Sequence, residues 1–441
     1  MAEENRTDQD DSRANGSDAP ADETDGEGPP TGETDDAAEA FERRIGRRYP
    51  SLEVVPSGNA TLAAGPTERS ALEAWITPVE EFFVLNHYPT PDVDGEEWTI
   101  TLSGAVDRPA ALTPSDLRQR YPETSVTHTM VCAGNGRAYF DSREGLPEEL
   151  VRWRDEAVGN AVWTGVPVGA VLADHGAETT GTWLTAVGGD APEGENVFAR
   201  SIPTSKALSD CVLAYEMNGE PLPPEHGRPV RLIVPGWYGV NNVKWLTELR
   251  VTEGMIAGPE WERYTRWQQR GYRLTAGVDE DAAERDSIPA FGLGEQFDAG
   301  VEHPYTYDAG VMSLIAVADG AAFTPREDGT VELPGVAWAG DDLVERVEVS
   351  LDGGETWSDA EFARPPQRGA WRPFRHVTEV PAGEYRVLTR ATDDAGRTQP
   401  ARVAAPGADR DPDADAFPWN PEGYGNNAYR AYGVTITVSD E

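Results

Sequence analysis

Short apolar runs closed by Gly and Pro are the main feature of residues 41–275. The runs EEFFVLNHYPTP (80–91) and EWTITLSGAV (97–106) predict strands, and TPSDLRQRYP (113–122) predicts a short helix with a Ser or Thr cap and a Pro stop. The stretch 211–239 predicts two apolar strands joined by a Gly- and Pro-rich loop. Short strands, few long helices and many turns favour an α+β domain that carries its chemistry on loops.

From about residue 309 the pattern changes to strict alternation. In ERVEVSLDGGETW, Val347, Val349 and Leu351 alternate with polar neighbours before a turn at Asp-Gly-Gly. GEYRVLTRATDDAGRTQP and YGVTITVSD repeat this arrangement. The pattern predicts an all-β, immunoglobulin-like sandwich over 309–441. The acidic, turn-rich segment 276–308 is interpreted as a linker or insertion between the two domains.

The N-terminal segment differs from both domains. Residues 1–40 contain fourteen acidic side chains and two arginines, but no Val, Ile, Leu, Phe, Trp or Tyr. Such a segment cannot bury enough apolar surface to offset the entropy that is lost on ordering. We therefore predict a disordered acidic tail over 1–40.

The whole chain is acidic, since 37 Lys and Arg face 78 Asp and Glu in 441 residues, a net charge of −41. Such a surface repels nucleic acid and anionic lipid, which disfavours both as partners. The charge favours a salt-adapted, halophilic protein in a high-salt cytoplasm, where screening weakens self-repulsion. A cytoplasmic location also agrees with a start, MAEENRTDQDDSR, that resembles no export signal, and with only two cysteines.

One of the two cysteines lies in a stretch of unusual composition, THTMVCAGNGR (127–137). Gly134 and Gly136 would let the backbone approach a ligand closely, while Asn135 and Arg137 offer hydrogen-bond donors. A thiolate beside donors is a nucleophile or a metal ligand, and the residues alone do not decide between these roles and a buried core cysteine. Cys211, inside DCVLAYEM, is interpreted as a core residue.

A second loop carries positive charge. EHGRPVRLIVPGWYGVNNVKW supplies His226, Arg231 and Lys244, with backbone amides around Gly236 and Gly239. Cations and amides that converge from a Gly-rich turn are what a phosphate-bearing cofactor needs. The alternative is that His226 and Arg231 only brace the loop.

Together these motifs resemble the molybdenum-cofactor domain of the sulfite oxidase family. The resemblance rests on CAGN with a following Arg, on LAYEMNGEPLPPEHGRPVRLIVPG and on VKWL. It continues in WQQRGY and in the C-terminal motifs SLDGGETW, RATDDAG and WNPEGYGNNAY, and it covers roughly 50–275 and 310–438. It implies an α+β cofactor domain over 41–275 and a C-terminal dimerisation domain over 309–441.

The resemblance also implies roles for single residues. Cys132 would be the only protein ligand of molybdenum, beside the dithiolene of molybdopterin, and a soft thiolate suits such an ion. Arg137 and Tyr272 would hold the oxygens of the substrate. The implied cofactor contacts are Phe83, Asn86, His87, Asp190, His226, Arg231, Asn242, Val243 and Lys244.

Two positions depart from the family pattern, because Leu85 and Glu422 stand where sulfite enzymes carry arginines. The resemblance therefore implies a cytoplasmic molybdenum oxidoreductase that transfers an oxygen atom to or from a small sulfur or nitrogen oxyanion. The alternatives are a reductase of neutral sulfoxides or N-oxides and a non-enzymatic binding protein that retains the fold. The chain shows no C-x-x-C-H haem site, so a separate electron carrier is expected. A homodimer is implied by resemblance alone.

Overall fold

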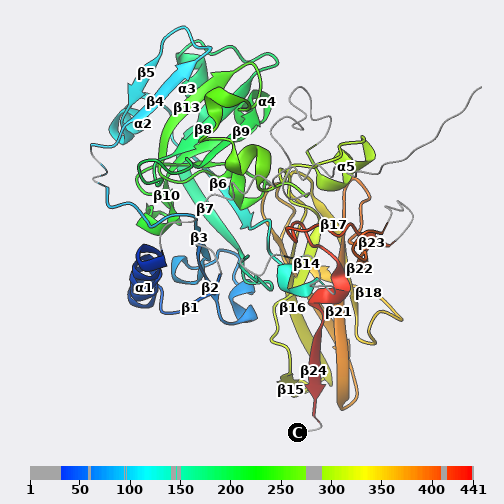
Figure 1. Ribbon diagram of the computed structural model, residues 1–441. Helices are drawn as coiled ribbons and strands as arrows, with labels where there is room; N and C mark the ends of the chain where they lie inside the picture. Colours follow the sequence, from blue (N-terminus) through cyan, green and yellow to red (C-terminus); the bar gives the residue numbers. More distant parts are fainter. Residues whose placement is uncertain are drawn as a thin grey trace, which may run out of the picture.

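The computed structural model describes residues 31–57, 61–93, 95, 97–140, 146, 150–274, 291–408 and 415–439. Figure 1 shows a mixed α and β body at the upper left and an elongated β sandwich at the lower right. This arrangement agrees with the predicted α+β domain followed by an all-β domain.

The described part of the chain begins with a helix that packs on a small antiparallel sheet. These elements are α1 (Thr31–Arg48), β1 (Leu52–Val54), β2 (Leu62–Pro66) and β3 (Val84–Asn86), and the strands pair in that order. Phe41, Ile45 and Tyr49 recur at four-residue spacing, which gives α1 one apolar face that is buried against the sheet. We call α1 and these three strands the N-terminal unit.

The predicted disordered tail of 1–40 is wrong for its last ten residues. Residues 31–40 belong to α1, although the sequence of this stretch contains no Val, Ile, Leu, Phe, Trp or Tyr. The reason is that the buried turns at Phe41 and Ile45 nucleate the helix, and a stretch rich in Ala and Glu extends it at little cost. Residues 1–30 lie outside the described part of the chain.

Two five-stranded sheets form the body of the first domain. One has the order β11-β10-β7-β6 with β12 also paired to β10, and the other has the order β5-β4-β13-β8-β9. The strands of the first sheet are β6 (Thr124–Val131), β7 (Val158–Pro167), β10 (Val212–Met217), β11 (Glu220–Pro221) and β12 (Arg231–Ile233). Those of the second are β4 (Ile100–Gly104), β5 (Ala110–Leu112), β8 (Trp183–Gly188), β9 (Ala199–Pro203) and β13 (Leu246–Thr252).

A shared apolar core joins the two sheets and confirms the predicted elements. Leu213 and Leu232 of the first sheet and Leu102 and Leu249 of the second are all fully buried in one cluster. The short helices α2 (Pro114–Arg120), α3 (Val168–Asp174) and α4 (Thr204–Ser209) lie between these strands in the chain. Thr113 caps α2 by accepting a hydrogen bond from the Asp116 amide, as the sequence predicts. β10 and β12 are the two apolar strands expected in 211–239, and they pair directly.

The C-terminal domain consists of two sheets packed face to face. One has the order β14-β16-β20-β19 and the other β15-β24-β21-β17-β18. The strands of the first are β14 (Met312–Ile315), β16 (Thr330–Trp338), β19 (Glu361–Phe362) and β20 (Arg372–Glu379). Those of the second are β15 (Ala321–Phe323), β17 (Val344–Ser350), β18 (Ser358–Asp359), β21 (Gly383–Asp393) and β24 (Val434–Val438). β22 (Arg402–Val403) and β23 (Ala416–Phe417) form a separate pair. Leu333 and Phe374 of one sheet meet Val349 and Ile436 of the other in a common core.

The sequence favours a linker or an insertion over 276–308, and of these two the linker is wrong for the part that the structure describes. Residues 291–308 include α5 (Leu293–Asp298) and return to the first domain, where Tyr305 and Tyr307 are fully buried. The Tyr307 ring lies 4.7 Å from that of Trp237, between ring centres. Two aromatic residues at alternate positions give this acidic segment enough apolar area to pack. Residues 275–290 lie outside the described part.

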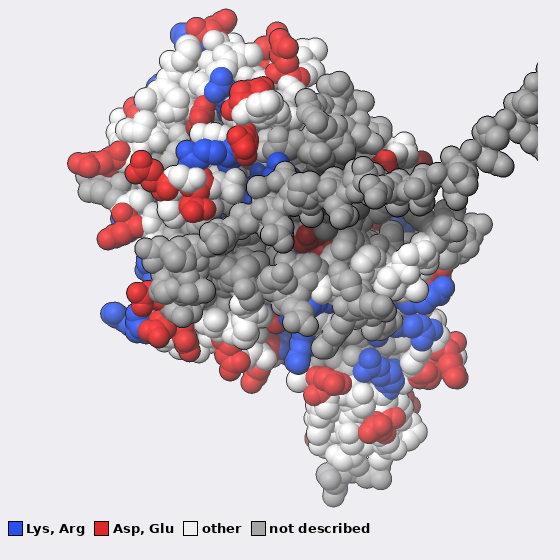
Figure 2. Space-filling model, in the orientation of Figure 1, with Lys and Arg blue, Asp and Glu red and all other residues white. Residues whose placement is uncertain are grey.

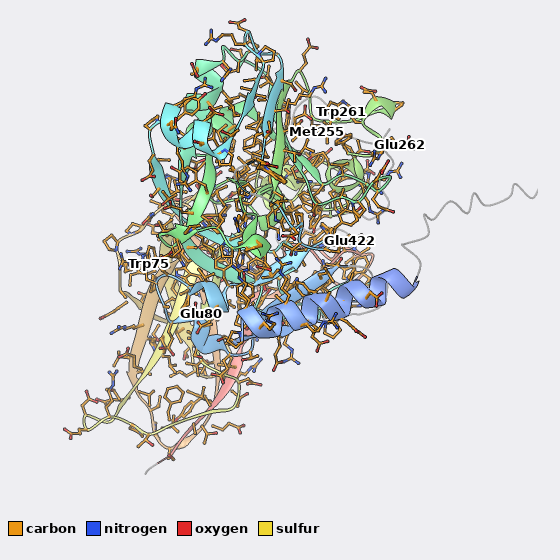
Figure 3. All side chains as sticks on the ribbon, turned by 90° about the vertical axis from the view of Figure 1, so that its left-hand side faces the viewer. Trp75, Glu80, Met255, Trp261, Glu262 and Glu422 are labelled. Atoms are coloured by element: carbon orange, nitrogen blue, oxygen red, sulfur yellow. The ribbon has the colours of Figure 1, made fainter. Side chains whose placement is uncertain are left out.

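Direct hydrogen bonds and one ion pair join the two domains. The Thr129 amide donates to the Gly369 carbonyl at 2.7 Å, and the Trp371 amide donates to the Thr129 hydroxyl at 2.6 Å. The Lys206 ammonium lies 2.6 Å from the Asp341 carboxylate across the junction. Figure 3 labels Trp75, whose carbonyl accepts a hydrogen bond from the Trp371 indole at 3.1 Å. The sandwich is therefore fixed against the sheet that carries β6.

Acidic side chains are spread over the face shown in Figure 2 and outnumber the basic ones there. Among the residues that the structure describes, no helix has the length and apolarity needed to cross a membrane.

Candidate active site

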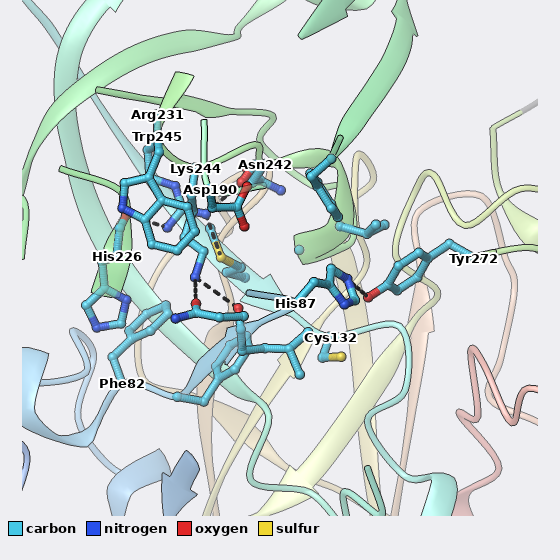
Figure 4. A pocket seen from close by; sticks show the side chains of 17 residues that line it. Phe82, His87, Cys132, Asp190, His226, Arg231, Asn242, Lys244, Trp245 and Tyr272 are labelled. Carbon is cyan, nitrogen blue, oxygen red and sulfur yellow. Dashed lines mark hydrogen bonds between the residues drawn. The ribbon is translucent and has the colours of Figure 1, made fainter. Parts of the chain in front are cut away.

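A pocket lies between β3, the loop after β6 and the loops on either side of β12, and it encloses about 700 Å³ of space that is partly open to solvent. Ten of the twelve predicted site residues line it. They are Phe83, Asn86, His87, Cys132, Asp190, His226, Arg231, Asn242, Lys244 and Tyr272. Figure 4 shows His226, Arg231 and Lys244 on one side of this pocket and Cys132, His87 and Tyr272 on the other.

Cys132 follows the last residue of β6 and begins a tight turn. Its amide donates to the Ala157 carbonyl at 2.9 Å, and its carbonyl accepts from the Asn135 amide at 2.9 Å. Burial raises the pKa of the thiol, while Arg137, the amides of Gly134 and Asn135, and the Trp153 indole lower it. Among the described residues, the indole nitrogen of Trp153 is buried without a hydrogen-bond acceptor. The turn thus surrounds a buried thiol with groups that favour its thiolate form.

The glycines of this turn serve its own packing. A Cβ on Gly136, which has a φ of 82°, would lie 1.7 Å from the Tyr432 hydroxyl. A Cβ on Gly134 would lie 2.5 Å from the guanidinium of Arg137. The two glycines therefore make room for side chains that support the turn, whereas the sequence suggested that they make room for a ligand.

At the other end of the pocket, a hydrogen bond joins the Arg231 side chain to the His226 backbone. The Arg231 guanidinium donates to the carbonyls of His226 at 2.9 Å and Asn242 at 2.8 Å. Its Nε and the Nε2 of His226 are buried without a hydrogen-bond partner among the described residues. Burial lowers the pKa of Arg231 to about 9, and burial beside Lys244 and Arg231 holds the pKa of His226 well below its usual range. Two unpaired buried polar atoms in one pocket wall mark a place for a bound acceptor.

Lys244 lies beside this pair. Its ammonium donates to the carbonyls of Leu85 and Glu225, each at 2.9 Å, and to the Asn86 side chain. Burial and the nearby Arg231 lower its pKa, and the negative charges of Asp190 and Glu225 partly oppose this. Burial also raises the pKa of Asp190. A buried anion in the pocket would favour the charged ammonium.

The side of the pocket that carries Tyr272 is aromatic. The His87 ring stacks on Trp267 with 4.9 Å between ring centres, and its Nε2 lies 3.0 Å from the Tyr272 hydroxyl. Burial, together with Lys244 and Arg266, lowers the pKa of His87 to about 3, so the ring is neutral. Burial holds the pKa of Tyr272 well above its usual range, so its hydroxyl keeps its proton.

Both domains support Tyr272. Its φ of 56° is unusual for a residue with a side chain. The Thr306 amide and hydroxyl both bind its carbonyl, at 3.1 and 2.9 Å. Its ring stacks on Tyr424, which lies between β23 and β24 of the C-terminal domain, with 5.2 Å between ring centres. These contacts hold the strained backbone in place.

Comparisons with known proteins agree with this geometry. Residues 87–259 match the family model of the oxidoreductase molybdopterin binding domain, and residues 303–406 match that of the Mo-co oxidoreductase dimerisation domain. The chain is 33% identical over 370 residues to sulfite oxidase of Gallus gallus, covering 81% of this chain and 74% of that protein. The chain belongs to the sulfite oxidase family.

Two further relatives show the extent of this likeness. The chain is 34% identical over 371 residues to mitochondrial sulfite oxidase of Macaca fascicularis, covering 81% of this chain but only 63% of that longer protein. The crystal structure of the sulfane dehydrogenase SoxCD from Paracoccus pantotrophus matches with a TM-score of 0.66 and 24% identity, over 96% of this chain and 95% of that one. The latter match supports the two-domain fold.

The pocket fits the cofactor of the sulfite oxidase family. The unpaired nitrogens of His226 and Arg231, next to the Lys244 ammonium, suit the anionic end of molybdopterin. The Cys132 thiol lines the opposite side of the same pocket, where it could bind a soft metal. Among the described residues no three His, Cys, Asp or Glu side chains form a metal-binding group.

Two predicted site residues do not line the pocket. Arg137 donates from Nε to the Glu422 carbonyl at 2.7 Å and from Nη1 to the Val151 carbonyl, so it braces the cysteine turn from behind. This geometry does not support its predicted contact with substrate oxygens. The Val243 side chain belongs to the apolar core, and only its carbonyl, which accepts from the Leu232 amide at 2.8 Å, ties the loop to β12.

Several wall residues were missed from the sequence. Phe82 and Trp245 line the pocket beside the predicted Phe83 and Lys244, so their position in the motifs could have indicated them. Phe198 stacks on His87 from a segment without any recognised motif, with 5.4 Å between ring centres. No sequence signal marks Phe198.

Proposed function

We propose that this protein is a molybdenum-cofactor oxidoreductase that transfers an oxygen atom to or from a small sulfur oxyanion, with sulfite as the first candidate substrate. One observation carries the proposal: the unpaired nitrogens of His226 and Arg231 share a pocket with the Cys132 thiol. A site with cationic donors at one end and a single soft ligand at the other suits a cofactor that is anionic and metal-bearing.

In this proposal each end of the pocket has its own task. Arg231, His226 and Lys244 bind the anionic end of molybdopterin, and Cys132 binds the metal as its thiolate. The bound cofactor supplies the two-electron oxidation or reduction and the oxygen atom that is transferred. Burial raises the pKa of the free thiol, the donors of the cysteine turn partly oppose this rise, and metal binding would displace the thiol proton.

The residues at the Tyr272 end orient the substrate and limit the access of water to the pocket. The Tyr272 hydroxyl keeps its proton and donates a hydrogen bond, either to a substrate oxygen or to the neutral His87, whose Nε2 lies 3.0 Å away. Arg266 is exposed at the start of η7 (Arg266–Arg270), next to the Trp267 ring that stacks on His87. Its charge reaches His87 and therefore attracts an anion to the mouth of the pocket.

The test is a substrate assay on metal-loaded protein. The full chain is produced in a host that makes molybdenum cofactor, and its metal and pterin contents are measured. Sulfite is then offered with an artificial electron acceptor. Turnover of sulfite supports the proposal, whereas purified protein without molybdenum and pterin would overturn it and favour a binding protein that retains the fold.

A second candidate is a reductase of neutral sulfoxides or N-oxides. The observation in its favour is Leu85, which lines the pocket where the family resemblance implies an arginine, beside a neutral His87. The same loaded protein is therefore assayed with a reduced dye as donor and a panel of sulfoxides and N-oxides. Faster turnover of these substrates than of sulfite would replace the first candidate.

We further propose a cytoplasmic homodimer, built through an immunoglobulin-like C-terminal domain, that passes electrons to a separate carrier.

The net charge of −41 supports salt adaptation. Raising salt from 0.1 M to 1 M shortens the Debye length from about 10 to about 3 Å and should raise the melting temperature. A melting temperature that does not rise would contradict salt adaptation.

A further inference from the structure

Glu225 is a buried carboxylate that the proposed function does not use. It lies in η4 (Pro224–His226), directly before the pocket residue His226, and its side chain is 0% exposed. It is not among the residues that line the pocket. A carboxylate removed from water is costly unless cations or donors compensate it.

Among the described residues, the side-chain partners of Glu225 come from one helix and the residue after it. The Tyr49 hydroxyl donates to Oε2 at 2.7 Å, and the Arg44 guanidinium pairs with Oε1. Arg48 approaches Oε2 to 3.8 Å. Arg44 and Arg48 lie in the last two turns of α1, and Tyr49 follows the helix directly.

The same short turn supports the cofactor end of the pocket. The Glu225 carbonyl accepts from the Lys244 ammonium at 2.9 Å, and the Pro224 carbonyl accepts from the Trp245 indole at 2.9 Å. The Tyr49 ring meets the His226 ring edge-on, with 5.9 Å between ring centres. Whatever fixes the Glu225 side chain therefore fixes the imidazole of His226 and an acceptor of Lys244.

The N-terminal unit contacts the pocket a second time. β3 supplies the Leu85 carbonyl and the Asn86 side chain to Lys244. α1 and β3 both precede residue 87, where the match to the molybdopterin-binding family model begins. Figure 3 shows α1 along its full length on the outside of the molecule.

We propose that α1 is part of the cofactor-binding apparatus, and that Arg44, Tyr49 and Glu225 are positioning residues for His226 and Lys244. The inference rests on the proposed function in one respect, namely that the pocket binds molybdopterin. It adds that a helix outside the matched domain controls how firmly the cofactor is held.

The experiment compares cofactor release with stability in the full-length protein. Tyr49→Phe removes one hydrogen bond, Arg44→Met removes the ion pair, and Arg44→Lys retains a charge. Arg43→Met is the matched control, because Arg43 lies on the same helix and pairs only with Glu39, both side chains being about two-thirds exposed at 67% and 68%. Each variant is assayed for molybdenum and pterin per chain, for the rate of cofactor release at one temperature, and for the melting temperature without cofactor.

We expect release to be about threefold faster in Tyr49→Phe, a loss of roughly one weak hydrogen bond. Arg44→Met should release faster still, with Arg44→Lys close to wild type and Arg43→Met unchanged. If Arg44→Met does not fold, Tyr49→Phe alone decides. Wild-type release rates in Tyr49→Phe, or variants that change only the melting temperature, would overturn the inference. Wild-type protein without any cofactor would instead overturn the proposed function.

Discussion

At the His226 end of the pocket the side chains are charged, buried and partly unpaired, whereas at the Tyr272 end they are aromatic and neutral. Arg231 and His226 each leave a nitrogen without a partner among the described residues. His87 and Tyr272 instead satisfy each other at 3.0 Å and are enclosed by stacked rings. The first end needs an anion to complete it, and the second does not.

This difference teaches that cofactor binding and substrate choice are encoded separately. The anionic end of a cofactor does not vary, so a few rigidly held hydrogen-bond donors around β12 are enough to bind it. In the proposed function, the choice of substrate would depend on the side chain at position 85 and on the supports that Tyr272 receives from both domains. Changes at one end should therefore leave the other intact, which the following variants test.

The largest effect is expected at the metal ligand. Cys132→Ser replaces a soft thiolate by a hard hydroxyl and should abolish turnover, while circular dichroism shows an intact fold. The control is Cys211→Ala, which removes a buried sulfur in the apolar core and should cost only about 1–2 kcal/mol of stability. Retention of most activity in Cys132→Ser would remove this residue from the site.

The second variant separates the two ends directly. Arg231→Met removes a buried cation at the cofactor end and should lower the molybdenum and pterin content about tenfold or more. Tyr272→Phe should keep the cofactor but lower kcat/KM by about tenfold or more, because one charge-assisted hydrogen bond is lost. Equal cofactor loss in both variants would show that the ends are not independent.

A smaller gain is expected from restoring charge at the substrate end. Leu85 lines the pocket, and burial raises the pKa of Tyr272, with a smaller contribution in the same direction from the charge of Glu422. Leu85→Arg with Glu422→Arg should raise kcat/KM for sulfite by about tenfold, or about 1.4 kcal/mol, mainly through KM. Leu85→Met controls for shape alone. A wild-type enzyme that already oxidises sulfite efficiently and gains nothing would show that Leu85 does not determine the substrate.

The smallest effect concerns pH. The pKa of His87 and that of His128 are both lowered to about 3 by burial, so between pH 3 and 6.5 each binds a proton only after unfolding. The free energy of unfolding should therefore fall as pH falls from 7 to 5. His87→Phe should reduce that loss by about 2 kcal/mol, as measured by denaturant titration. An unchanged slope would mean that His87 is protonated in the folded protein.

Local pattern and motif were enough to predict much of this molecule. The two strands in 211–239, the capped helix at 113–122 and the alternating strands after 309 all appear, because each is determined by neighbouring residues. The pocket residues in the cysteine turn and around β12 were found because their motifs are specific to a family.

Contacts between distant residues could not be predicted. The sequence does not show that Arg137 points toward the carbonyls of Glu422 and Val151, since one of these lies 285 positions away. Nor does it show that Tyr305 and Tyr307 pack against Trp237. In the sequence, nothing distinguishes Glu225 from the many other acidic residues. Its three partners, Arg44, Arg48 and Tyr49, are visible only in the structure.

The stack of Tyr424 on Tyr272 joins the C-terminal domain to the substrate end of the pocket. A displacement of one domain relative to the other would thus act on the tyrosine hydroxyl before it reached the cofactor end. In evolutionary terms, if Tyr272 contacts the substrate as proposed, the domain named for dimerisation would also support the substrate site. Relatives that exchange or remodel this domain would change their substrate preference while keeping the same cofactor.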